Sequence, residues 1–219
     1  MLTETRQTQA NSRVTSPALI ISAIASGLVI LVSLFRWTIV EYLTPFLEPF
    51  LEMAIAGFLV IALIWSIVHC LKAWGRGLAF AFLPLIVCLL TAAIAIFVPF
   101  NELTTNVDFR VHYNARMAVV SDVLAGRYDK YIESTGGSGD LIALPTKLAY
   151  LSSGGGEIIR LRKQDRTLIL FFSFRGVLDS FSGFVYSSDN LAPSNGDFLA
   201  NFVEVIPLRK NWFWVASRN

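Results

Sequence analysis

The sequence predicts a membrane α-helical anchor of three transmembrane helices, followed by a C-terminal α+β domain whose antiparallel sheet has about five strands. The first reason is the charge distribution. Residues 1–100 contain five Lys or Arg and four Asp or Glu, whereas residues 101–219 contain thirteen and twelve. The second reason is periodicity, because long uncharged apolar runs fill the first half and alternating apolar residues appear in the second. We therefore expect a tail over 1–16, a transmembrane region over 17–100 and a separate domain over 101–219.

Three apolar runs are long enough to cross a bilayer, at about 18–40, 53–71 and 78–98. The uncharged part of the first run, Ala18 to Phe35, would extend about 27 Å as a helix, against a hydrocarbon core of about 30 Å. We therefore extend this span to residue 40, which places Arg36 near its end, where the guanidinium can reach the headgroups. The sequence thus predicts an integral membrane protein, and its first partner is the lipid bilayer.

The short segments that flank the spans predict the orientation, because Lys and Arg are enriched on the cytoplasmic side. The N-terminal tail carries Arg6 and Arg13, and the connection 72–77 carries two more bases, whereas the connection 41–52 has three acids and no base. We expect a cytoplasmic N-terminus and an extracytoplasmic C-terminal domain, in an inner or plasma membrane or its equivalent. Arg36 alone argues against this orientation.

Two features inside the spans have alternative interpretations. Small residues recur at four-residue spacing at Ala18, Ser22 and Ser26, which favours close approach of another helix, either within the bundle or across a dimer seam. His69 lies in an apolar run near the cytoplasmic end of its span, so it is either an interfacial histidine or a functional proton relay or metal ligand. The three spans hold no internal array of acids and bases and do not predict a transport pathway.

The C-terminal domain is expected to begin with a helix over roughly 110–125, with Asp108 as its N-cap and Gly126 just after its end. A glycine-rich stretch at 133–140 is expected to be a flexible loop, because it fits neither a phosphate-binding loop nor a nucleophile elbow. A short helix is expected from Pro145 to about Leu151, where the glycines at 154–156 end it.

Alternating residues then predict the strands of the sheet. The segments 157–163 and 167–174 should form a hairpin, and 168–174 is apolar on both faces, which indicates a central strand covered by a helix on one side. A further strand is expected at 183–187. The last hairpin should pair Phe202 to Leu208 with Trp212 to Ala216.

Four residues are candidate binding residues. Arg175 and Asp179 stand in a segment of otherwise apolar and small residues, where Arg175 could hold an anionic ligand or a partner carboxylate with Asp179 orienting it. The alternative is that the two pair with each other and fix a connection between strands. Trp212 and Trp214 alternate onto one face of the last strand, either as core residues or as a face resting on headgroups or on a partner subunit.

The combination of Gly-Gly-Gly-Glu-Ile at 154–158 with Phe-Arg-Gly-Val-Leu-Asp-Ser-Phe-Ser-Gly-Phe-Val-Tyr at 174–186 resembles an uncharacterised bacterial membrane-protein family. The resemblance covers roughly residues 110–187 and none of the spans. It implies a bacterial protein and no known activity, and it transfers no catalytic residue.

The residues do not predict an enzyme, a metal site or a cofactor. His112 is the only histidine of the C-terminal domain, and no nucleophile is evidently spaced to suit it, although Ser180 and Ser182 are candidates. Zinc would need several His or Cys ligands, and the acids at 189–197 do not fit an EF-hand. The net charge of +2 is too small and too evenly spread for nucleic-acid binding.

Our functional hypothesis is a non-enzymatic, membrane-anchored extracytoplasmic module for protein binding or scaffolding, an accessory subunit that works with other membrane-protein subunits. One alternative is an extracytoplasmic sensor that binds a small anionic ligand at Arg175. Another is a membrane-tethered hydrolase of unfamiliar type, which would require Ser180 or Ser182 to lie near His112.

Overall fold

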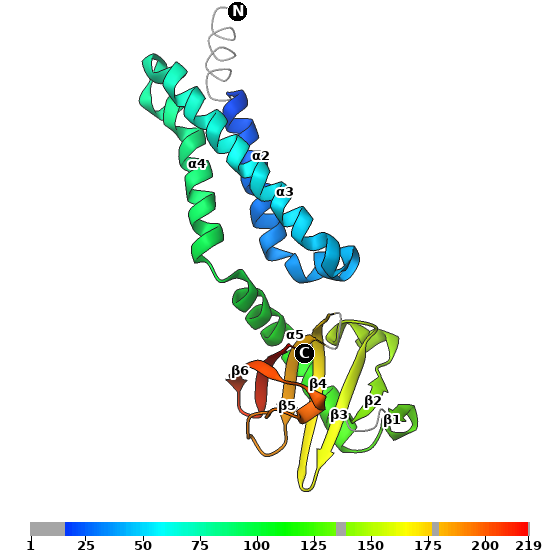
Figure 1. Cartoon of the computed structure of the whole chain (residues 1–219). Helices are drawn as coiled ribbons and strands as arrows, with labels where there is room; N and C mark the ends of the chain where they lie inside the picture. Colours follow the sequence, from blue (N-terminus) through cyan, green and yellow to red (C-terminus); the bar gives the residue numbers. More distant parts are fainter. Residues whose placement is uncertain (1–15, 135–138, 177–179, 219) are drawn as a thin grey trace, which may run out of the picture. The chain divides into compact units, whose positions relative to one another are not determined.

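The computed structural model describes residues 16–134, 139–176 and 180–218. The chain divides between Leu103 and Thr104 into two compact units, shown in Figure 1. The first unit contains three long apolar helices and the second is an α+β domain. The predicted fold class is confirmed.

The first unit contains the helices that can cross a membrane: α2 (Pro17–Leu34), α3 (Arg36–Ala73) and α4 (Leu78–Phe97), with the short η1 (Trp74–Arg76) between the last two. Length and composition suit a membrane span in all of α2, in Leu47–Ala73 of α3 and in Phe80–Phe97 of α4. The start of α2 is fixed by the Ser16 hydroxyl, which accepts a hydrogen bond from Leu19 N at 3.1 Å. The protein is therefore an integral membrane protein with three candidate spans.

The connection between the first two spans differs from the prediction. The first helix ends at Leu34, before residue 40, and the expected loop 41–52 belongs to α3. Arg36 Nε lies 2.8 Å from Glu48 Oε1 and 3.1 Å from Glu52 Oε1. Twelve residues of straight helix would extend about 18 Å, so the chain must bend between Arg36 and Glu48. Prolines at 45 and 49 lack the N–H of a regular helix and explain the bend.

Small residues form the interior of the helical bundle. Ser22 Oγ of α2 lies 2.9 Å from Ser66 Oγ of α3, and the Ser66 hydroxyl also donates to Ala62 O at 2.7 Å. Cys88 of α4 completes this buried contact with Ala25 and Ala62. Ala18, Ser22 and Ser26 are all buried within the unit, so this row of small residues serves packing inside the bundle.

The helix of the α+β domain is longer than predicted, because α5 covers Phe100–Leu124 and starts ten residues before 110. Asp108 lies inside this helix and does not cap it. Its side chain instead contacts other α5 side chains, with Oδ1 2.7 Å from His112 Nδ1 and Oδ2 2.6 Å from Arg116 Nη2. The predicted end is confirmed, since Gly126 has a φ of +75° and donates to Val123 O.

The sheet contains seven described strands, all antiparallel, in the order β1-β2-β3-β4-β5-β7-β6. The two strands beyond the predicted five are short and include both ends of the expected loop 133–140, so residues 133–134 and 140 belong to strands. Residues 135–138 of that loop lie outside the described part. Strands of three or four residues are too short to show an alternating pattern, so the sequence does not predict them. The bounds are β1 (Ile132–Ser134), β2 (Asp140–Ala143), β3 (Glu157–Lys163), β4 (Arg166–Arg175), β5 (Phe181–Ser187), β6 (Phe202–Arg209) and β7 (Trp212–Ser217).

The described part of the domain also contains three short 3-10 helices: η2 (Asp129–Tyr131), η4 (Thr146–Leu151) and η5 (Asp197–Leu199). The helix expected at 145–151 is present as η4. The glycines that follow it, at 154–156, all have positive φ values of 75°, 106° and 73°, as expected for residues that end a helix.

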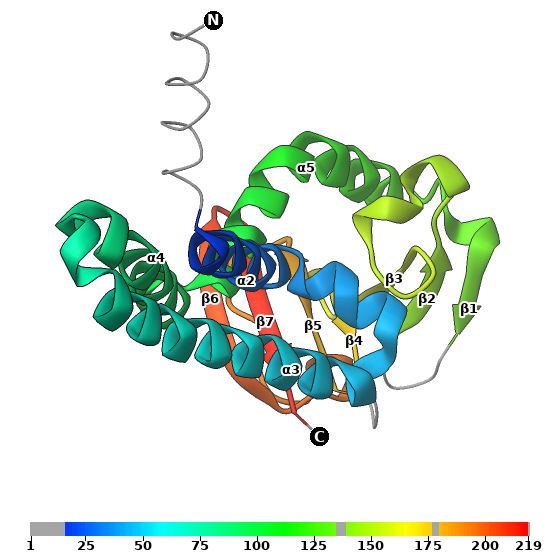
Figure 2. The ribbon, with the colours of Figure 1, turned by 90° about the horizontal axis from the view of Figure 1, so that it is seen from above.

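Different elements cover the two faces of the sheet. Helix α5 covers one face, where Phe109 and Val120 pack with Phe171, Phe184 and Trp212, and Figure 2 shows α5 on one side of the strands. The other face carries a second apolar cluster of strand residues that is completed by Phe198 from the connection between β5 and β6. The prediction that β4 is central and covered by a helix on one side is confirmed, and a loop closes the opposite side.

Candidate functional site

Arg175 at the end of β4 contacts Glu157 at the start of β3. Its Nη1 lies 2.6 Å from Glu157 Oε2 and donates to Gly154 O at 3.2 Å, and its guanidinium carbon lies 4.2 Å from the centre of the Phe172 ring. Asp179, the expected partner of Arg175, lies outside the described residues. The guanidinium of Arg175 is thus paired with the Glu157 carboxylate, which the sequence does not indicate as its partner.

The glycine-rich segment is shaped to receive the Arg175 side chain. A Cβ at Gly154 would lie 2.6 Å from Arg175 Cδ, and Gly154 has a φ of +75°. The two segments of the resemblance, 154–158 and 174–186, therefore meet at this end of the sheet. The ion pair between Arg175 and Glu157 joins neighbouring strands, which is a structural role for Arg175.

Trp212 and Trp214 lie in the core beneath α5, where they are 0% and 8% exposed. The indole N–H of Trp212 points to Met117 Sδ of α5 at 3.3 Å. Both residues do share one face of β7, as the alternation predicts. That face is turned toward α5, so the indole rings pack in the core and present no open surface to headgroups or to a partner.

Asp108, His112 and Arg116 form a polar cluster on α5, but a nucleophile is not among the described partners of His112. The contacts of the imidazole are Asp108 and the Tyr150 ring, 5.2 Å away between centroids. The hydroxyl of Ser182 lies 3.2 Å from that of Ser173. Burial lowers the pKa of Arg116, and the neighbouring Asp108 carboxylate opposes this effect. These contacts do not join Ser182 to His112 as a hydrolase would require.

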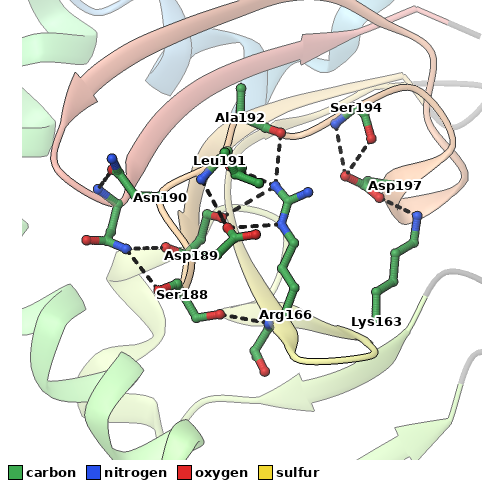
Figure 3. A network of polar contacts seen from close by, with 12 residues as sticks. Lys163, Arg166, Ser188, Asp189, Asn190, Leu191, Ala192, Ser194 and Asp197 are labelled. Carbon is green, nitrogen blue, oxygen red and sulfur yellow. Dashed lines mark hydrogen bonds and ion pairs between the residues drawn. The ribbon is translucent and has the colours of Figure 1, made fainter.

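Side chains from β3 and β4 hold the connection 188–201 between β5 and β6, which we call the β5–β6 loop. Arg166, at the start of β4, donates from Nη2 to the carbonyls of Leu191 and Ala192 at 2.7 and 2.9 Å, and its Nε lies 3.3 Å from Asp189 Oδ1. Figure 3 shows this guanidinium pointing toward Asp189, Leu191 and Ala192 of the loop. The turn of one hairpin thereby fixes a loop that follows it by more than twenty residues.

Asp189 organises the first part of the loop. Its Oδ1 accepts hydrogen bonds from Ser187 Oγ at 2.6 Å and from Leu191 N at 3.0 Å. The bond from Ser187 does most to lower the pKa of Asp189, with Leu191 N and Arg166 assisting against the cost of burial. The carboxylate is therefore held in its charged form.

Asp197 organises the second part. It is 0% exposed and lies 2.5 Å from Lys163 Nζ, and its other oxygen accepts from Ser194 N at 2.9 Å. Burial raises the pKa of this carboxyl group, but the bonds from Lys163 and Ser194 outweigh burial, so the pKa of Asp197 lies below its ordinary value. Figure 3 shows Lys163 reaching the loop from the end of β3.

The tip of the loop has a strained backbone. Phe198 and Leu199 have φ values of 55° and 57°, in the left-handed region that residues with a Cβ seldom adopt. Such residues cost about 1–3 kcal/mol each and persist only where the surroundings over-determine them. Here Lys163 and Ser194 hold Asp197, the residue before Phe198. The Phe198 side chain is buried in the second apolar cluster.

The constrained loop exposes two large apolar side chains. Leu191 is 62% exposed and Leu199 is 63% exposed, while their neighbours Asp197 and Phe198 are buried. The sequence predicts a polar loop over 188–197, whose acids do not fit an EF-hand. Leu191 inside that stretch and Leu199 just after it were the available signal, but their exposure depends on long-range contacts of the loop with Arg166 and Lys163.

Within the described residues, no group of three or more His, Cys, Asp or Glu side chains is placed to hold a metal ion. Comparison of the chain with family models, with curated proteins and with solved structures finds no match.

Proposed function

We propose that this protein is a non-enzymatic, membrane-anchored binding module that uses the β5–β6 loop to dock another membrane-protein subunit. The observation that carries the proposal is the exposure of Leu191 and Leu199 on a loop whose backbone is held by Arg166 and Lys163. A loop already ordered before binding loses little conformational entropy when a partner arrives, so its apolar contacts contribute more fully to affinity.

The strain at Phe198 and Leu199 supports this role. Core packing requires Phe198, but it does not require the next side chain to be a leucine that faces solvent. Strained backbone that is held in place by surrounding contacts tends to occur at binding and catalytic sites. Exposed apolar anchors surrounded by polar groups are typical of protein interfaces.

We place this domain on the extracytoplasmic side. Lys72 lies two residues before η1, Arg76 is the last residue of η1, and Arg6 and Arg13 belong to the tail. Bases in such short flanking segments favour the cytoplasmic side. Arg36 is the one base that argues against this orientation, and it is paired with Glu48 and Glu52. The four bases on the other side outnumber it.

The rival functions have less support. The anion-binding group that a sensor would use, Arg175, is paired with Glu157. The hydrolase would need a serine beside His112, whereas Ser182 bonds to Ser173. A protein-binding role requires neither a free anion-binding arginine nor a serine beside His112.

Site-specific photocrosslinking in native membranes tests the proposal. A photoreactive amino acid at position 199 should give a discrete adduct with one membrane protein, while the same group at the exposed Lys147 position should not. Leu191→Asp should lower the yield from position 199 at least about tenfold, since losing an apolar anchor from an interface costs about 2 kcal/mol.

The fold control is thermal unfolding of the full chain in detergent. Because Leu191 is exposed, Leu191→Asp should change the stability of the domain by less than about 0.5 kcal/mol. Equal adducts from positions 199 and 147, or a yield that Leu191→Asp leaves intact, would contradict the proposal.

A further inference from the structure

A pocket of about 270 Å³ lies between two helices of the membrane unit. The first residues of α2, Pro17 and Ala18, form one wall, and the last turns of α3 form the other. The α3 lining residues are Trp65, Val68, His69 and Lys72.

The pocket lies at one end of the membrane spans. Contacts of Ser22 with Ser66 and of Ala25 with Ala62 show that α2 and α3 run antiparallel, so the start of α2 is level with the end of α3. Pro17 is the first residue of one candidate span, and Lys72 is the penultimate residue of the next. The ends of membrane spans lie where lipid phosphates are found.

One end of the pocket suits an anion. Lys72 brings an ammonium group, and the N-terminus of the 18-residue helix α2 contributes the positive end of its dipole. His69 adds an imidazole whose Nε2 is enclosed and has no hydrogen-bond partner among the described residues. A turn of the ring toward an occupant would give a ring nitrogen such a partner.

The remainder of the pocket suits an acyl chain. Trp65 and Val68 precede Lys72 by two turns and one turn of α3, so they lie deeper along the span. Both are substantially exposed in the protein, at 54% and 43%, and therefore face the space that lipid fills. A free phosphate ion would use only the polar end, whereas a phospholipid would use both.

We infer that this pocket is a binding site for an anionic phospholipid, with the phosphate at Lys72 and the acyl region along Trp65 and Val68. Basic pockets between transmembrane helices recognise lipid headgroups in this way. The site does not depend on the β5–β6 loop or on the orientation of the protein, because the argument concerns only one end of the bundle.

Native mass spectrometry of the full chain in a neutral detergent tests the inference with phosphatidylglycerol and phosphatidylcholine of matched acyl chains. The first phosphatidylglycerol should bind about fivefold more tightly than phosphatidylcholine, because one basic side chain gains about 1 kcal/mol from a headgroup with a net negative charge and less from a zwitterionic one. Equal affinities for the two lipids would overturn the inference.

Three variants locate the site. Lys72→Gln should reduce phosphatidylglycerol affinity to the phosphatidylcholine level, and Lys72→Arg should retain it. Lys210→Gln, which makes the same charge change in the exposed turn between β6 and β7, should have no effect. Unchanged affinity in Lys72→Gln would overturn the inference.

Two further measurements separate the alternatives. Val68→Trp leaves the charge intact and narrows the pocket, so it should weaken the binding of both lipids. If Lys72→Gln lowers the helical content measured by circular dichroism, Val68→Trp replaces it as the test of the site. Millimolar inorganic phosphate should not displace the lipid. Displacement would identify a site for soluble phosphate and would overturn the assignment to a lipid.

Discussion

At the scale of single residues, Arg175 shows how a candidate ligand-binding group acquires a structural role. Its guanidinium contacts Glu157, Gly154 O and the Phe172 ring, all within the segments that surround β3 and β4. The ion pair is only about one-third exposed on each side, with 34% and 32% of the two side chains accessible. Such a pair contributes modestly and depends on the position of both partners.

A double-mutant cycle tests this role of Arg175. Arg175→Ala should destabilise the domain by about 1–2 kcal/mol, because it removes both the ion pair and the contact with Phe172. Glu157→Ala should cost about 0.5–1 kcal/mol, and the double variant should cost less than the sum of the two. The measurement is urea unfolding of the full chain in detergent, followed by tryptophan fluorescence.

The matched control is Lys210→Ala, which removes a positive charge from an exposed turn and should leave unfolding unchanged. If Arg175→Ala also left unfolding unchanged, Arg175 would serve a ligand or a partner and the structural role would be refuted.

At the scale of elements, the β5–β6 loop is both a cover for the sheet and a candidate interface. Phe198 completes the apolar cluster on the face opposite α5, and the neighbouring Leu199 faces outward. The polar contacts of Asp197 with Lys163 and Ser194 are what hold these two side chains on opposite sides. The loop should therefore respond to changes at Asp197.

Asp197→Asn should destabilise the domain by about 1–3 kcal/mol at neutral pH, because it removes a charged hydrogen bond from Lys163 and leaves a poorer acceptor in a buried position. The folded protein lowers the pKa of Asp197, so it binds fewer protons here than the unfolded chain does. This contribution to stability is present above about pH 4 and is lost as the pH falls through the lower folded pKa.

Unfolding of the full chain measured between neutral and strongly acidic pH checks this prediction. The loss of stability on acidification should be smaller in Asp197→Asn than in the parent protein. Glu204→Gln, at an exposed position of β6, should behave like the parent. Identical acid profiles for the parent and Asp197→Asn would show that the loop does not depend on this carboxylate.

At the scale of the whole molecule, the chain combines a bundle of candidate membrane spans with a separate α+β domain. The bundle has small, weakly polar side chains at its buried contacts, such as Ser22, Ser66 and Cys88. Large aromatic clusters and several ion pairs characterise the α+β domain, whereas Arg36 pairs with Glu48 and Glu52 in the first unit. The side chains of the first unit thus suit a lipid environment, and those of the α+β domain suit water.

Topology reporters test the proposed orientation. Alkaline phosphatase fused after Asn219 should be active, because three crossings from a cytoplasmic N-terminus place that end outside. The same reporter inserted at Gly75 should be inactive. The opposite pattern would refute the orientation, and activity at both positions would refute three crossings.

The sequence alone determined the features that depend on local composition and period. These include three apolar spans, the hairpin of β3 and β4, the central position of β4, and Gly126 at the end of α5. In each case the deciding physics lies within a few neighbouring residues, such as hydropathy over a span, alternation in a strand, or a positive φ at a glycine.

Tertiary structure alone decided which distant groups meet. Arg36 pairs with Glu48 and Glu52, and these two acids, which the sequence places in the loop 41–52, lie in helix α3. Arg175 pairs with Glu157, and Trp212 and Trp214 are buried beneath α5. Arg166 and Lys163 hold the β5–β6 loop, which exposes Leu191 and Leu199. Ion pairing and burial depend on distances between residues far apart in the chain, and no local pattern encodes those distances.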